Sequence, residues 1–434
     1  MNFKEYLDFD ENLPNIDLNK VVDETTPLGI ESYYNTLMDE YIKLKNNIQD
    51  TPKVCFKKGC EIICKVTNYC NQNCSYCFDL ENRKRGKEVL SKERILKLLI
   101  LLLEDGFIDI EWIWHGGECL SVNKEWLDDV CFCMEKEVIK YKAELTFSIQ
   151  SNATLLDDEW IKIIDKYNMG LGSSYDWSAQ SQRGYSLSEY ALSKINYFIT
   201  VVTNKNINTL IEDYENAKKM EVPFSFNFVF GAQGHKTNDF LSLDKMIPAY
   251  KKYFDYFLYD QSPQIIERSA SAYIGRVIGR EAEVCHLGNC LNSNRICINS
   301  NGDLLICDTT SIKEIHICSI DEINSISEFF SHPNRIKLIN LKEKQINDNC
   351  LNCDLLQACG QGCLHCTISE SNGIKPYSYQ CTFFKAIAPY IYEKIGNLTP
   401  EEFVKLNPSV KQYLIQHRYL PAYKKEELKE LWKL

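Results

Sequence analysis

Six short runs of β-forming residues alternate with helical stretches between residues 61 and 229. In the stretches between them, such as residues 92–105, 124–140 and 157–167, apolar residues recur every three or four positions, the period of a helix with one buried face. This alternation is typical of parallel βα units and not of an all-β protein or a helix bundle. The predicted strands are residues 61–67, 108–114, 143–150, 170–175, 199–203 and 223–229. We therefore predict an α/β fold, a partial (β/α)6 TIM-like barrel, with functional residues just after the strands.

The composition is that of an ordinary folded protein. Hydrophobic residues make up 44% of the 434 residues and charged residues 25%, which argues against disorder or a fibrous repeat. The formal net charge is −11 and lysines and arginines form no long run, so we expect neither nucleic acid nor a membrane surface as a partner. The longest apolar run, residues 98–103, is far shorter than the roughly 20 residues that span a bilayer. Because the acidic N-terminus has no apolar signal-peptide core, we expect a cytoplasmic location.

Shifts in composition divide the chain into five predicted segments. The first is an N-terminal extension over residues 1–57, with a helix near residues 31–46, and we interpret it as a packing segment. The others are the barrel (58–234), a helical linker (235–284), a small cysteine-rich domain (285–385) and a charged helical tail (386–434).

Twenty cysteines are many for a chain expected in a reducing compartment, where clustered thiols are better read as metal or iron–sulfur ligands than as disulfides. Cys70, Cys74 and Cys77 follow the first predicted strand with the spacing CxxxCxxC. In structural zinc sites, protein ligands fill all four coordination positions of the metal. Three thiols on one loop instead leave one iron of a 4Fe–4S cluster without a protein ligand. A zinc site completed by a distant Cys or His, or three incidental buried thiols, is the alternative.

This loop, with aromatic Tyr76 before its last cysteine, resembles the cluster loop of radical S-adenosylmethionine (SAM) enzymes. After the second predicted strand, Gly116, Gly117 and Glu118 resemble the family's GGE segment. The resemblance implies that this segment holds the methionine amino group of SAM, since a glycine pair allows close backbone approach and a carboxylate accepts hydrogen bonds from an ammonium. Cys119 stands where the family usually has proline.

Two further segments extend the resemblance. Residues 150–156 resemble the family's QTNGTLL with Ala153 in place of the glycine, and residues 173–177 resemble its SLDG with Trp177 in the glycine position. The implied SAM contacts, in addition to Tyr76 and the GGE segment, are Gln150, Ser174 and Asp176. Arg183 corresponds either to a downstream family arginine that faces the active site or to a solvated surface residue.

A second cysteine array has the pattern Cx11Gx4C, a gap, Cx2Cx5Cx3C, a gap, and C, after one further leading cysteine. Its members are Cys285, Cys290, Cys307, Cys350, Cys353, Cys359, Cys363 and Cys381. The pattern matches the SPASM domain of radical SAM peptide and protein maturases. A zinc ribbon built on the Cys350–Cys353 pair is the alternative.

The resemblance implies three 4Fe–4S clusters in all, one that binds SAM and two auxiliary clusters that the eight thiolates of the second array ligate fully. By the family's interleaved arrangement, one auxiliary cluster is held by Cys285, Cys290, Cys307 and Cys363, and the other by Cys350, Cys353, Cys359 and Cys381. Cys297 and Cys366 lie close enough in the sequence to substitute for the outermost ligands.

The implied activity is peptide maturation by radical chemistry. SAM cleavage would supply a 5′-deoxyadenosyl radical, the auxiliary clusters would relay an electron, and a flavodoxin or ferredoxin would be the electron donor. We expect a thioether or carbon–carbon crosslink in a ribosomally made precursor peptide or protein.

The first alternative is an anaerobic sulfatase-maturating enzyme, which oxidises Cys or Ser to formylglycine; against it, residues 224–230 contain no carboxylate for the catalytic acid of that group. An iron–sulfur electron carrier or redox sensor is the non-enzymatic alternative, and it leaves the GGE segment unexplained. The sequence identifies no catalytic acid or base.

Overall fold

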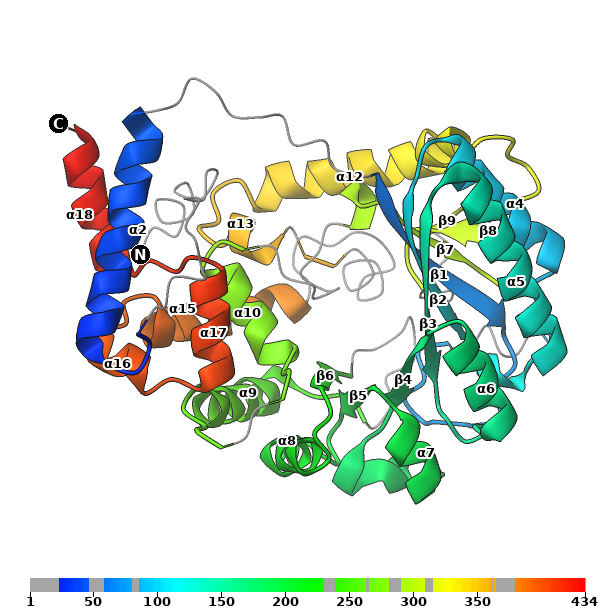
Figure 1. Cartoon of the computed structure of the whole chain (residues 1–434), viewed down its shortest axis with the longest axis horizontal. Coiled ribbons are helices and arrows are strands. Elements are labelled where there is room, and N and C mark those ends of the chain that lie inside the picture. Colours follow the sequence, from blue (N-terminus) through cyan, green and yellow to red (C-terminus); the bar gives the residue numbers. More distant parts are fainter. Residues whose placement is uncertain are drawn as a thin grey trace.

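The computed structural model describes residues 23–46, 58–79, 86–229, 239–262, 265–280, 290–308, 315–360, 362–363 and 379–433. Within them, one mixed sheet has the strand order β6-β5-β4-β3-β2-β1-β7-β8-β9 (Figure 1). Its first six strands pair in parallel, in chain order: β1 (Gly59–Thr67), β2 (Asp109–Gly116), β3 (Glu144–Ser151), β4 (Gly170–Ser174), β5 (Tyr197–Val202) and β6 (Phe224–Phe228). All six predicted strands are confirmed, and so is the α/β fold class.

Helices follow the parallel strands in turn and lie on the outer side of the curved sheet (Figure 1). They are α4 (Lys92–Glu104), α5 (Lys124–Tyr141), α6 (Asp158–Lys166), α7 (Glu189–Lys194) and α8 (Leu210–Lys219), with short 3-10 turns η1 (Cys119–Ser121) and η2 (Trp177–Arg183). The helix starts follow from local sequence: the side chains of Ser91, Asn123 and Asp157 each accept a hydrogen bond from a backbone N–H of the first turn. The helices predicted at residues 92–105, 124–140 and 157–167 are confirmed.

Three strands from the cysteine-rich region extend this sheet beyond β1. β7 (Arg295–Ile298) pairs in parallel with β1, and β8 (Asp303–Leu305) and β9 (His316–Ser319) continue antiparallel. The barrel and the cysteine-rich segment therefore share one sheet, which brings the second cysteine array to the barrel. The predicted domain borders stay a prediction.

The remaining helices lie in the predicted linker, the cysteine-rich segment and the tail. They are α9 (Leu243–Leu258), α10 (Ser269–Val277), α11 (Ile326–Phe330), α12 (Pro333–Asn349), α13 (Leu356–Cys359), α15 (Tyr379–Ile395), α16 (Pro400–Val404), α17 (Pro408–Gln416) and α18 (Ala422–Lys433), with the 3-10 turn η4 (Cys290–Asn292). None of the helices in the described ranges has the length and apolarity needed to cross a membrane.

The N-terminal helix α2 (Pro27–Asn46) packs against the end of the chain, beside α18 in Figure 1. Tyr34 makes edge-on ring contacts with Phe403 and Tyr419, and the Lys424 ammonium lies 2.6 Å from the Glu31 carboxylate. Within the described residues, the N-terminal extension thus contributes a packing helix, as the sequence predicts.

Candidate functional site

A cavity of about 360 Å³ opens at the carboxyl ends of the parallel strands, a size within the range of small-molecule sites. The loop after β1 contributes all three of its thiols. Apart from the second cysteine array, the predicted site residues that line the cavity are Cys70, Cys74, Tyr76, Cys77, Gly116, Gly117, Gln150 and Ser174. Four segments that the sequence analysis selected separately therefore meet at one place, although their individual roles stay predictions.

The second cysteine array reaches the same cavity through Cys307 and Cys363. Lys342 of α12 is buried and interacts electrostatically with four of the array's thiols, namely Cys290, Cys350, Cys359 and Cys363. Cys353 instead lines a separate outer groove with Lys385 and Tyr392. Cys381, near the start of α15, is partly buried; burial raises the pKa of its thiol, and the charges of Cys353 and Cys350 add to this rise. Cys285 lies outside the described residues.

The thiol loop, residues 70–77, is held to the barrel by hydrogen bonds on the Cys70 side. Asn152 after β3 donates to Asn71 (2.9 Å), and Asn71 donates to Thr154 (2.8 Å). The Cys70 sulfur accepts from the Gln72 backbone N–H at 3.4 Å. Farther along the loop, Ser75 donates to Asp239 at 2.5 Å.

The donor chemistry of this loop suits an iron–sulfur cluster. Its three thiols line one cavity, and thiolates are the ligands of 4Fe–4S clusters. In such a cluster the thiolates bind different irons. The N–H group directed at the Cys70 sulfur suits a sulfur that carries negative charge.

The glycine pair brings the ends of β1 and β2 together. Gly116 has φ +139°, and a Cβ atom there would lie 2.3 Å from the Thr67 carbonyl oxygen. A Cβ atom on Gly117 would lie 2.3 Å from the Tyr69 carbonyl oxygen. The sequence analysis assigned these glycines to close approach of a ligand; in the structure both line the cavity, and the close approach is to the backbone that leads into the thiol loop.

Glu118 lies behind the cavity wall and is fully buried. Its carboxylate accepts hydrogen bonds from Ser151 Oγ (2.7 Å), Asn152 N (2.7 Å) and Leu120 N (2.9 Å), so it joins the segments after β2 and β3. Burial raises the pKa of Glu118, and these hydrogen bonds oppose the rise. A direct contact between Glu118 and SAM stays a prediction.

Both positions where the chain departs from a family glycine have positive φ. Ala153 has φ +56° and Trp177 has φ +45°, values that favour glycine. Trp177 is held there by packing on Tyr175 and Phe198 and by a hydrogen bond from its indole N–H to Thr200 Oγ1 (3.1 Å). These contacts hold Trp177 in a backbone conformation that favours glycine.

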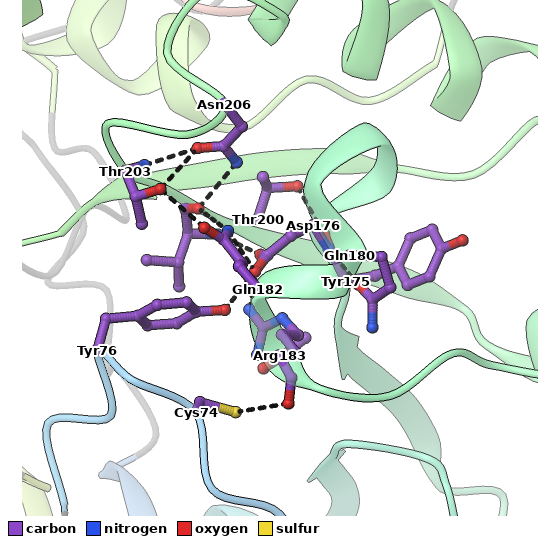
Figure 2. A network of polar contacts seen from close by, with 12 residues as sticks. Cys74, Tyr76, Tyr175, Asp176, Gln180, Gln182, Arg183, Thr200, Thr203 and Asn206 are labelled. Carbon is purple, nitrogen blue, oxygen red and sulfur yellow. Dashed lines mark hydrogen bonds and ion pairs between the residues drawn. The ribbon is translucent and has the colours of Figure 1, made fainter. Parts of the chain in front are cut away.

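Asp176 is fully buried at the centre of a polar network (Figure 2). Its carboxylate accepts hydrogen bonds from Tyr76 Oη, Gln182 Nε2 (2.7 Å) and Val201 N (3.0 Å), and it pairs with Arg183 (2.7 Å). Arg183 is 6% exposed and lines the cavity, so the interpretation of this arginine as a solvated surface residue is wrong. Burial opposes the charge of Arg183, but the Asp176 carboxylate raises the pKa of the guanidinium.

Sequence reasoning missed several polar residues of the cavity. Asp79 and Asp308 line it, each within two residues of a predicted cluster ligand, and so do Tyr185 and Asn227. His115 also lines it; burial and the charge of Lys65 lower its pKa, and its Nδ1 accepts from the Gly116 backbone N–H at 2.8 Å. The available signal was the position of both aspartates beside motif cysteines.

Comparison with known proteins identifies a domain match and several relatives of this chain. Residues 64–176 match the Radical SAM superfamily. A cysteine-type anaerobic sulfatase-maturating enzyme of Clostridium perfringens is 20% identical over 365 residues, which cover 78% of this chain and 97% of that protein. A serine-type anaerobic sulfatase-maturating enzyme of Bacteroides thetaiotaomicron is 26% identical over 223 residues, which cover 49% of this chain and 48% of that protein.

Two solved structures are similar in fold. Native anSMEcpe with bound AdoMet and a Kp18Cys peptide has a TM-score of 0.63 at 18% identity, over 77% of this chain and 98% of that one. Streptococcus suis SuiB bound to its precursor peptide SuiA has a TM-score of 0.53 at 18% identity, over 81% of this chain and 80% of that one. At such identities the structural likeness concerns the fold alone.

The matched domain, the alignment over nearly the whole length of a relative and the shared fold agree with the cavity geometry. The chain contains a radical SAM domain over residues 64–176, is homologous to the anaerobic sulfatase-maturating enzymes, and is an enzyme.

Proposed function

We propose that this protein is a peptide or protein maturase that oxidises a side chain of its substrate by two electrons. One observation carries the proposal: the three thiols of the loop after β1 and two thiols of the second array line the same cavity. A substrate residue in that cavity would lie between the two predicted cluster regions. The fold and the donor set imply SAM and a 4Fe–4S cluster; the count of three clusters is part of the proposal.

Cys70, Cys74 and Cys77 would hold the cluster to which SAM binds. When bound there, SAM is a source of the 5′-deoxyadenosyl radical. The chain's own residues shape the cavity around it: Ile199, Val201 and Phe228 form an apolar wall over β5 and β6 that excludes water. Asp79, His115 and Asp308 are polar groups of the same cavity and could orient a substrate or accept a proton.

Two products are compatible with this oxidation. A thioether or carbon–carbon crosslink in a ribosomal precursor peptide is the product we proposed from the sequence, and SuiB, which shares the fold, was crystallised with a precursor peptide. Formylglycine is the second candidate. The objection that residues 224–230 contain no carboxylate loses its force, because Asp79 and Asp308 enter the cavity from other segments.

The test begins with anaerobic reconstitution, iron counting and an assay for 5′-deoxyadenosine. About twelve irons per chain and SAM cleavage support the proposal, and zinc without iron overturns it. Candidate peptides encoded beside the gene are then incubated with the loaded protein and a flavodoxin or ferredoxin. A product that loses two hydrogens and does not react with a hydrazide is a crosslink, whereas an aldehyde that reacts with the hydrazide is formylglycine.

A further inference from the structure

The buried carboxylate of Asp176 connects the thiol loop to the barrel wall (Figure 2). We propose that the hydrogen bond from Tyr76 to Asp176 is a latch that positions the thiol loop for its cluster, and that Asp176 is a positioning residue. The inference rests on the proposed function, because it concerns the loop that would hold the cluster.

The hydrogen-bond acceptor sites of the Asp176 carboxylate are occupied by groups of the protein itself. An ionised carboxylate has about four lone-pair sites. One oxygen accepts from Tyr76 Oη and Gln182 Nε2, and the other accepts from Val201 N and pairs with Arg183. With four donors in place and no solvent exposure, this carboxylate is occupied by the fold and not by a ligand.

Three contacts connect the thiol loop to the segment from Asp176 to Arg183. Tyr76 lies between Cys74 and Cys77 in the loop, and its hydroxyl donates to Asp176. The guanidinium carbon of Arg183 lies 5.3 Å from the centre of the Tyr76 ring. The Cys74 sulfur lies 3.9 Å from the Arg183 carbonyl oxygen. Two of the three cluster thiols therefore flank a side chain whose position is set by Asp176.

Asp176, the acceptor of the latch, is held in place by a hydrogen-bond network of its own. Gln182 accepts from Thr203 Oγ1 at 2.8 Å through its other amide atom, and the Asp176 backbone N–H donates to Gln180 at 2.7 Å. Val201 belongs to β5, which places the anchor in the barrel sheet. Because ordering a free loop costs conformational entropy, a latch of this kind lowers the cost of binding a cluster.

The test variant is Tyr76→Phe, which removes only the hydroxyl and keeps the ring against Arg183. The matched control is Tyr190→Phe, which removes another tyrosine hydroxyl that donates to an aspartate, here Asp158 on the exposed face of the barrel. In the reconstituted protein we would measure the rate at which an anaerobic chelator removes iron, and the change that SAM causes in the EPR signal of the reduced cluster. The second readout responds to the geometry of the loop cluster and not to stability alone.

We expect Tyr76→Phe to lose about four irons roughly tenfold faster than the wild type, since a hydrogen bond to a charged group has about that effect. We also expect a higher SAM concentration at half-maximal EPR change, with Tyr190→Phe equal to the wild type in both readouts. If Tyr76→Phe and the wild type lose iron at the same rate and respond to the same SAM concentration, the proposed latch is wrong. A wild-type protein with no EPR response to SAM overturns the proposed function instead, so the two failures can be told apart.

Discussion

The ammonium group of Lys65 on β1 lies 3.0 Å from the carboxylate of Asp79, and both side chains are shut off from solvent. Lys65 precedes the thiol loop and Asp79 follows it, so the ion pair joins the two ends of the loop segment. Burial opposes the charge of Lys65, but Asp79 and Asp308 more than offset this and raise its pKa. The two aspartates of the cavity thus share one buried cation.

Replacing Lys65 by methionine should destabilise the fold by about 3–5 kcal/mol, because it leaves the Asp79 carboxylate buried without its partner. The double variant Lys65→Met, Asp79→Leu removes both charges and should regain most of the loss. Urea unfolding of both variants measures the difference. A double variant no more stable than the single one would contradict the ion pair as the source of the effect.

Replacing any one of Cys70, Cys74 and Cys77 by alanine should abolish release of 5′-deoxyadenosine, because each would ligate a different iron of one cluster. The irons of the second array should remain, since none of these three thiols belongs to it. Cys133→Ala on α5 is the control, as this cysteine lies in neither array. Iron analysis and chromatography of the reaction mixture provide the readouts, and retained SAM cleavage in a loop variant would refute the assigned role.

The fold was predictable because hydrophobic periodicity is a local signal. Each predicted strand overlaps an observed one, since apolar β-forming runs such as residues 143–150 are bounded by helical stretches of a different period. The extension of the sheet by β7 was not predictable. Its four residues, Arg295–Ile298, lie in a cysteine-rich segment, and their pairing with β1 is a contact between residues far apart in the chain.

The candidate site was predictable as a set of residues but not as a set of contacts. Motif resemblance selected Asp176 and Glu118 by residue type, yet both side chains are buried in the protein's own hydrogen-bond networks behind the cavity. A motif contains no information about side-chain direction, which depends on packing between segments. For the same reason Asp308, which comes from a distant part of the sequence, was missed.

Replacing Lys342 by methionine should lower the midpoint potential of the clusters bound by the second array. A buried cation near four of the array's thiols favours the reduced, more negative state, and its loss should shift the potential by tens of millivolts. Lys344→Met, an exposed lysine on the same helix, is the control. Potentiometric titration followed by EPR would show the shift, and equal potentials in the two variants would exclude this electrostatic effect.

Ala153 and Trp177, the two residues with positive φ that stand at family glycine positions, should respond in opposite directions to replacement by glycine. Ala153→Gly relieves a left-handed conformation that costs about 1–2 kcal/mol, partly offset by the flexibility of glycine in the unfolded chain, so we expect a gain of up to about 1 kcal/mol. Trp177→Gly relieves the same strain but loses a buried indole, which costs about 3–5 kcal/mol. Urea unfolding of both variants measures the change in the free energy of unfolding. Changes of the same sign in the two variants would contradict the prediction.

Glu267 should make the protein less stable as the pH rises from about 5 to about 7. Burial raises the pKa of Glu267 to about 7, although its carboxylate accepts from the backbone N–H groups of Ser269, Ala270 and Ser271 at the start of α10. A carboxyl whose pKa is raised on folding favours the folded state while it is protonated, and this contribution, about 3 kcal/mol at most, is lost as the pH passes from the unfolded to the folded pKa. The Glu267→Gln variant cannot ionise at this position. The free energy of unfolding of the wild type minus that of the variant should therefore be more positive at pH 6 than at pH 8. Urea unfolding at both pH values measures this quantity, and an increase with pH would mean that the hydrogen bonds outweigh burial.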